Sequence, residues 1–175
     1  MKTIVVYYSR KGSNSFLAKK IASRLSCDME AIRPRINVFA LFLMRIHAGI
    51  RPLKHDIGSY DRVIMVGPIW MGMFVPPLRS FLRRYGSQIR KLVFVTCCGS
   101  TYDKKDEKFG HGHVFREVGE IMGEKLDLTQ AFPVGLVLPD EQKEDPDAFM
   151  KTHLNEENFR GEIAERFEAF MKKVG

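Results

Sequence analysis

The chain has 175 residues, of which 45% are hydrophobic and 28% charged, and its formal net charge is +7. This composition is ordinary for a globular protein, and we predict one domain over residues 1–175. No apolar run approaches the ~18 residues of a membrane span, which argues against a transmembrane segment. The sequence shows neither basic residues interleaved with aromatic residues nor a recognisable nucleic-acid-binding module, so no nucleic-acid partner is expected.

Strand and helix patterns alternate along the chain. Short runs rich in β-branched and aromatic residues are typical of buried strands, and we predict strands at 3–8, 29–32, 62–67, 91–97 and 132–138. Apolar residues at helical spacing predict helices at 14–25, 78–89, 114–126 and 156–174. This alternation predicts an α/β fold with a doubly wound parallel sheet and helices on both faces.

Three polar, glycine-bearing loops follow predicted strands, at 9–15, 68–77 and 96–106. In doubly wound sheets, ligands bind outside the carboxyl ends of the strands. We therefore expect one site, built from all three loops, at one edge of the sheet.

The first loop gathers hydroxyls, an amide and two cations just before a helix: Ser9, Arg10, Lys11, Gly12, Ser13, Asn14 and Ser15. A helix N-terminus offers unpaired N–H groups and a positive dipole end, which suit an anion. The loop is neither a dinucleotide fingerprint nor a Walker motif, since only one glycine is present. This loop taken by itself fits two interpretations equally, phosphate binding and simple capping of the helix.

The second loop places Trp70, the single tryptophan, after a buried strand and before Gly72. A tryptophan beside an anion site could form a stacking wall for a flat ring. A half-buried packing role is the alternative.

Together these segments resemble the flavodoxin family, FMN-binding doubly wound proteins with sheet order 2-1-3-4-5. The likeness runs through most of residues 1–125. It rests on SRKGSN at 9–14 with Ala18 six residues after the glycine, and on YD at 60–61, PIWMG at 68–72 and PPLRSFL at 76–82. Lys11 stands where the family prefers threonine, and Ser13-Asn14 where it prefers Asn-Thr.

The resemblance implies that the 9–15 loop holds the FMN phosphate and that the flavin ring lies between the second and third loops. No side-chain acid or base is needed, because the flavin carries the chemistry, so no catalytic residue is assigned. The second and third loops then supply the cofactor-binding residues Pro68, Ile69, Trp70, Met71, Gly72, Thr96, Cys97, Cys98, Gly99 and Tyr102.

Charge separates the two halves of the chain. Residues 1–100 hold 17 Lys/Arg against 4 Asp/Glu, and residues 101–175 hold 11 against 17. Electron-carrier flavodoxins tend to be acidic, so the basic half departs from the family. Three functions stay open: an FMN electron carrier between redox partner proteins, an FMN-dependent oxidoreductase acting on a quinone or porphyrinogen-type ring with NAD(P)H or a membrane quinone, and a flavin-free interaction module.

The apolar segment at 38–46 (VFALFLMRI) is too short to cross a membrane. We expect a buried crossover helix there. The alternatives are a lid, a homodimer surface, or a patch that contacts a membrane peripherally and admits a quinone-like substrate.

Cysteine usage and the N-terminus predict a cytoplasmic protein. The three cysteines are odd in number, two of them adjacent, and the chain enters a strand without a signal-like apolar region. Cys97 and Cys98 are expected to pack, and no metal site is predicted because no ligand spacing fits one. His111 and His113 are expected in a flexible loop, and the acidic stretch at 139–147 in a solvated loop.

Overall fold

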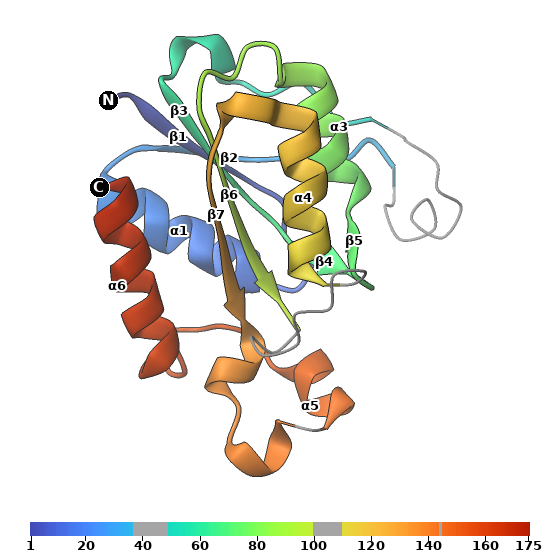
Figure 1. Ribbon diagram of the computed structural model, residues 1–175, viewed down its shortest axis with the longest axis vertical. Helices are drawn as coiled ribbons and strands as arrows, with labels where there is room; N and C mark the ends of the chain where they lie inside the picture. Colours follow the sequence, from blue (N-terminus) through green and yellow to red (C-terminus); the bar gives the residue numbers. More distant parts are fainter. Residues whose placement is uncertain (37–48, 100–109, 144) are drawn as a thin grey trace.

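The computed structural model describes residues 1–36, 49–99, 110–143 and 145–175. The predicted segment at 38–46 and Tyr102 lie outside the described residues. A five-stranded parallel sheet in the order β2-β1-β3-β6-β7 forms the centre (Figure 1). The predicted α/β fold and the order 2-1-3-4-5 are confirmed. The strands are β1 (Thr3–Tyr7), β2 (Asp28–Ala31), β3 (Arg62–Val66), β6 (Leu92–Cys98) and β7 (Leu126–Pro133).

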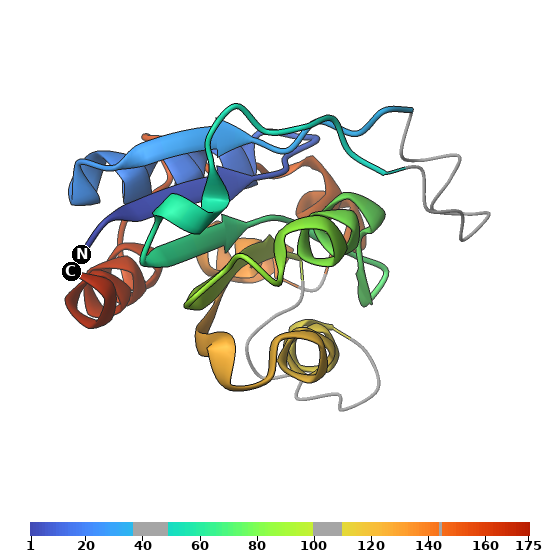
Figure 2. The ribbon, with the colours of Figure 1, turned by 90° about the horizontal axis from the view of Figure 1, so that it is seen from above.

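Helices cover both faces of the sheet, as Figure 2 shows. One face packs against α1 (Ser13–Leu25) and α6 (Glu162–Val174), and the other against α3 (Pro76–Tyr85) and α4 (His111–Met122). Successive side chains of a strand point to opposite faces. Val63 and Met65 therefore pack with α3, whereas Ile64 packs with α1 and α6. β3 is fully buried and so contributes side chains to both cores.

The fifth strand lies earlier than predicted. It spans Leu126–Pro133, and Val134–Val137 forms a 3₁₀ helix instead of continuing the strand to residue 138. β7 is an edge strand whose first half is only partly buried, so it alternates Leu, Asp, Leu and lacks a continuous apolar run. Pro133 cannot donate a ladder hydrogen bond and ends the strand.

Other boundaries also differ from the prediction. α6 begins at Glu162 and not at residue 156, because Gly161 adopts a φ of 64° just before it. The stretch 139–147 is not simply a loop: a 3₁₀ turn at Asp140–Gln142 leads into α5 (Pro146–Lys151), whose N-terminus is capped by Asp145. His111 and His113 lie in the first turn of α4 and not in a loop.

A short antiparallel hairpin follows β3. Its strands are β4 (Ile69–Trp70) and β5 (Met73–Phe74), and its two turn residues Met71 and Gly72 have φ values of 49° and 72°. Positive φ at both turn positions is the mark of a type I′ turn, which matches the twist of the strands it joins. The hairpin holds Trp70 at the carboxyl edge of the sheet.

Candidate functional site

A cavity of about 550 Å³ opens at the carboxyl edge of the sheet. All three predicted loops contribute to it. The predicted site residues that line it are Ser9, Arg10, Lys11, Ser13, Asn14, Pro68, Ile69, Trp70, Met71, Gly72, Cys97, Cys98 and Gly99. Gly12, Ser15 and Thr96 are not among the lining residues, and Tyr102 is not described.

The first loop turns into α1 at Gly12, whose φ of 106° disfavours any residue with a side chain. The Gly12 N–H donates to Ser9 Oγ at 3.2 Å, and the Ser15 hydroxyl donates to the Gly12 carbonyl at 2.7 Å. Ser15 therefore shapes the loop from outside the cavity. No side chain among the described residues caps α1, so simple capping does not account for this loop. The first-turn N–H groups have no acceptor within the helix.

Asn14 ties the first loop to the third. It is 5% exposed; its Nδ2 donates to the Cys97 carbonyl at 3.2 Å, and its Oδ1 accepts from the Cys97 N–H at 2.9 Å. Both ends of the amide are thus engaged with β6. The structure gives Asn14 the role of holding two walls of the cavity together.

Lys11 and Ser13 reach the segment around α5. The Lys11 ammonium donates to the Met150 carbonyl at 2.8 Å, and Ser13 Oγ accepts from the Leu154 N–H at 3.1 Å. These two contacts hold α5 and the segment after it against the first loop. The loop expected to bind phosphate is therefore also the anchor of a third wall.

Trp70 is half-buried and fixed from two sides. Its ring meets Tyr8 edge-on with centroids 6.1 Å apart, and the Arg10 guanidinium lies 5.8 Å from its centroid. Burial raises the pKa of the Tyr8 hydroxyl and Arg10 lowers it less, so Tyr8 stays protonated at neutral pH. Trp70 packs on Tyr8 and also faces the cavity, so the two predicted roles are not exclusive.

The third loop begins inside the core. Thr96 is fully buried and Cys97 nearly so, and burial raises the pKa of the Cys97 thiol far above its usual range. Thr96 therefore belongs to the sheet and not to the cavity wall. Cys98 Sγ lies 3.9 Å from His111 Nδ1, and burial lowers the pKa of His111. Cys97 and Cys98 are packed thiols, and Gly99 reaches the cavity.

The sequence model of a flavodoxin domain matches residues 4–164. The chain belongs to the flavodoxin family. A flavoprotein from Lactobacillus acidophilus, solved in complex with FMN, has 16% identity and a TM-score of 0.59 over 74% of this chain and 91% of that one. A putative flavoprotein from Bacteroides eggerthii has 18% identity and a TM-score of 0.57 over 74% and 87%. No curated protein sequence matches the chain significantly.

The flavodoxin-family cavity of this chain has walls that the sequence analysis missed. They come from the residue before α4, the residue after β7, and α5 with the segment that follows it: Gly110, Val134, Phe149, Met150, Thr152 and His153. One signal was present, because Asp145-Pro146 combines a capping residue with a proline at the first helical position, which is typical of a helix start.

Cationic and apolar side chains line the flavodoxin-family site together. Arg10 and Lys11 supply cations at the first loop, and no carboxylate occurs among the described lining residues. Ile69, Trp70 and Phe149 supply apolar and aromatic surface, and the Arg10 guanidinium lies over the Trp70 ring. No described helix is long and apolar enough to cross a membrane.

Proposed function

We propose that the chain binds FMN non-covalently in the carboxyl-edge cavity and transfers electrons through it. The observation that carries the proposal is the pairing, in one cavity, of an uncapped helix N-terminus flanked by Arg10 and Lys11 with an aromatic wall at Trp70. The cavity volume of about 550 Å³ lies within the ~300–1,000 Å³ range of cofactor sites. FMN is the ligand in the complex of the L. acidophilus flavoprotein.

The residues present fit the phosphate of such a ligand. A Cβ placed at Gly12 would meet nothing within 4 Å, so space lies open beside the loop backbone. The first-turn N–H groups and the Lys11 ammonium would hold a dianion there, since charge-assisted hydrogen bonds to phosphate are strong. Ser9 would add a hydroxyl.

The apolar and aromatic side chains of the cavity fit a flat ring. The rigid hairpin would present Trp70 to one side of the ring, and Ile69 and Phe149 would exclude water. When bound, the flavin supplies the redox chemistry, and a dry, cationic surrounding tunes its electronics. The side chains and backbone of the protein would thus bind the flavin, orient it and shield it from water.

A second candidate function is an FMN-dependent oxidoreductase that acts on a quinone-like ring. The observation that favours it is apolar surface at the cavity rim, where Met71 is 77% and Met150 65% exposed. An apolar substrate would find contacts there that a purely polar rim does not offer. NAD(P)H consumption with a water-soluble quinone separates this function from electron transfer between proteins.

The decisive experiment is an FMN titration of the purified chain, followed by flavin absorption and fluorescence. We expect a perturbed flavin spectrum and saturable binding. Trp70→Ala should weaken FMN binding roughly 10- to 100-fold, as the loss of a stacking contact worth about 1–3 kcal/mol implies. Lys11→Gln should weaken it about tenfold or more.

The matched control is Lys19→Gln, which removes an exposed lysine of the same helix region outside this cavity. It should leave FMN affinity unchanged. An unperturbed flavin spectrum with a folded wild-type chain would sink the cofactor assignment and leave a flavin-free interaction module.

A further inference from the structure

Residues 32–36 and 49–53 form a short two-stranded ribbon that leaves the sheet beyond β2; we call it the arginine ribbon. The Arg51 N–H donates to the Arg33 carbonyl at 2.8 Å, the Arg35 N–H to the Gly49 carbonyl at 3.4 Å, and Pro34 bridges Ile50. Three exposed arginines, Arg33, Arg35 and Arg51, are thereby brought together.

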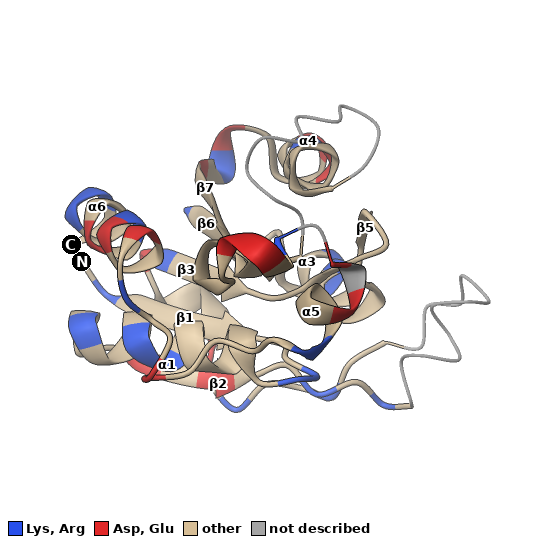
Figure 3. Cartoon of the chain, turned by 90° about the horizontal axis from the view of Figure 1, so that it is seen from below, with Lys and Arg blue, Asp and Glu red and all other residues tan. Residues whose placement is uncertain are grey.

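No described carboxylate forms an ion pair with the arginines of the arginine ribbon. Within the described part of the chain, Arg33, Arg35 and Arg51 form no ion pair, whereas cations such as Arg24 and Arg79 pair with glutamates. The ribbon sequences, IRPRI and GIRPL, contain no carboxylate. Figure 3 shows blue stretches and no red along this part of the chain. Clustered like charges repel one another unless an anion joins them.

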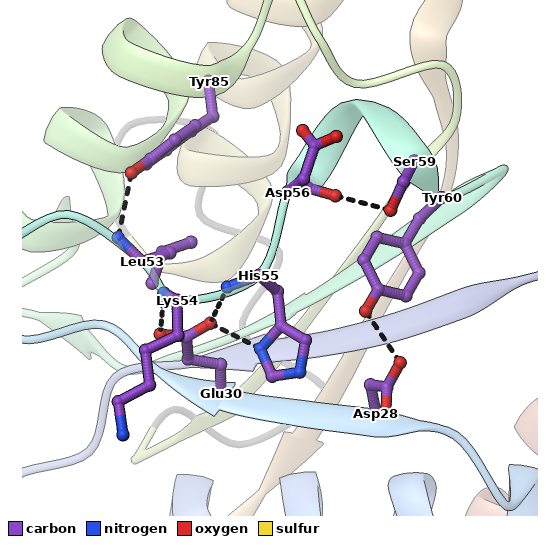
Figure 4. Close-up of polar contacts among 9 residues, drawn as sticks. All are labelled: Asp28, Glu30, Leu53, Lys54, His55, Asp56, Ser59, Tyr60 and Tyr85. Carbon is purple, nitrogen blue, oxygen red and sulfur yellow. Dashed lines mark hydrogen bonds and ion pairs between the residues drawn. The ribbon is translucent and has the colours of Figure 1, made fainter.

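The base of the arginine ribbon is firmly anchored (Figure 4). Glu30 accepts from the Lys54 and His55 N–H groups at 2.6 and 3.0 Å, and the Tyr85 hydroxyl accepts from the Leu53 N–H at 3.0 Å. Arg84 Nη1 donates to the Ile50 carbonyl at 3.2 Å. The arginines are therefore presented on a preformed base.

Large apolar side chains are exposed on the same side of the molecule. Ile36 of the arginine ribbon is 60% exposed, and Met71 and Met73 of the β4–β5 hairpin are 77% and 38% exposed. Figures 1 and 2 both draw the ribbon and the hairpin on the right-hand side of the molecule. Met71 also lines the cavity, so the tip of the hairpin adjoins it.

We propose that this side of the molecule docks peripherally on a membrane surface that carries anionic phospholipids. Guanidinium groups bind phosphate in a two-pronged geometry, and the boundary between headgroups and acyl chains takes up side chains such as Ile36 and Met71. A lipid surface offers phosphate and hydrocarbon within one layer, whereas an acidic protein surface offers chiefly carboxylates. The mixture of arginine and exposed apolar residues therefore selects lipid. Docking in this orientation turns the cavity mouth toward the bilayer.

The test is sedimentation of the full chain with vesicles of phosphatidylcholine alone, and with vesicles containing equal amounts of phosphatidylglycerol and phosphatidylcholine. We expect binding to the anionic vesicles only, weakened by added salt. The combined variant Arg33→Gln, Arg35→Gln and Arg51→Gln should lower the partition coefficient roughly 100-fold, since each interfacial basic residue contributes about fivefold.

The control variant Lys19→Gln, Lys172→Gln and Lys173→Gln removes the same charge from exposed positions on α1 and α6. It should bind anionic vesicles almost as well as the wild type. An equal loss of vesicle binding in both variants would show that net charge alone governs binding, and would overturn the proposal. Arginine-dependent binding to polyglutamate without binding to anionic vesicles would assign the ribbon to an acidic protein instead. The readout is independent of FMN, so it stands or falls separately from the proposed function.

Discussion

Asn14 and Cys97 are joined by two hydrogen bonds across the carboxyl edge of the sheet. The side-chain amide of Asn14 satisfies both the carbonyl and the N–H of Cys97, at 3.2 and 2.9 Å. Residue 14 opens a helix and residue 97 lies near the end of β6, so this pair connects two of the three loops that shape the cavity.

Asn14→Ala should lower the free energy of unfolding by about 3 kcal/mol. The substitution leaves two buried backbone groups of Cys97 without partners, and each unsatisfied group costs about 1–3 kcal/mol. Urea unfolding followed by circular dichroism measures the change. Ser23→Ala, on the exposed face of the same helix, should be nearly neutral. A neutral Asn14→Ala would mean that water replaces the amide at no cost.

Gly12→Ala should destabilise the chain by about 1–3 kcal/mol, because a φ of 106° is rarely adopted by residues with a Cβ. Nothing lies within 4 Å of the added Cβ, so the cost is one of backbone conformation. Gly112→Ala is the matched control: it also meets nothing, but it lies within α4 and should stabilise by about 0.5–1 kcal/mol. Equal effects of the two variants in thermal unfolding would contradict this reasoning.

Glu30 should make stability depend on pH in the acid range. Burial raises its pKa, but hydrogen bonds from Lys54, His55 and the His55 ring outweigh burial and bring the pKa below its ordinary value of 4.5. A lowered folded pKa contributes stability that is present above the unfolded pKa and lost as the pH falls through the folded one. Urea unfolding from neutral pH to pH ~3 should show this loss. Glu30→Gln should be less stable at neutral pH and should flatten the acid part of the profile.

Tyr60 should make the stability of the fold depend on pH in the alkaline range. Burial, followed by its hydrogen bond to Asp28 at 2.7 Å, raises the pKa of the Tyr60 hydroxyl to about 12. A raised folded pKa contributes stability that is complete below the unfolded value of 10 and lost as the pH rises through about 12. The tyrosinate absorbance of the wild type minus that of Tyr60→Phe isolates this group. A difference titration centred near 10 would contradict the buried hydrogen bond.

The fully buried strands β3 and β6 were predicted to within one residue, and so was the partly exposed edge strand β2, whereas β7 was not. β3 is buried on both faces and so reads as an unbroken apolar run, whereas β7 is an edge strand with polar residues in its first half. Apolar and polar residues alternate in the first half of β7, so this stretch resembles a loop. The strand was therefore predicted at the next apolar run, 132–138. Local sequence patterns report burial, and in β7 the polar residues of the partly buried first half hid the strand.

The candidate site was also predicted only in part. Ser9, Lys11 and Trp70 could be assigned to one cavity because their loops follow parallel strands that end at one edge. The contributions of Phe149, Met150 and His153 depend on how a segment folds back from far along the chain, which local patterns do not encode. The hydrogen bonds between Asn14 and Cys97 also join residues far apart in the sequence, which local patterns do not reveal. The sequence analysis therefore assigned the Asn14 amide to the ligand.

The hydrogen bond from Lys11 to the Met150 carbonyl links two parts of the chain that are 139 residues apart. An ammonium group has three donors, so Lys11 can serve that carbonyl and a phosphate together. Occupancy of the loop and docking of α5 then stabilise each other, and by linkage a bound anion slows local opening of α5. Amide hydrogen exchange within Pro146–Lys151 should therefore report whether an anion is bound at the 9–15 loop.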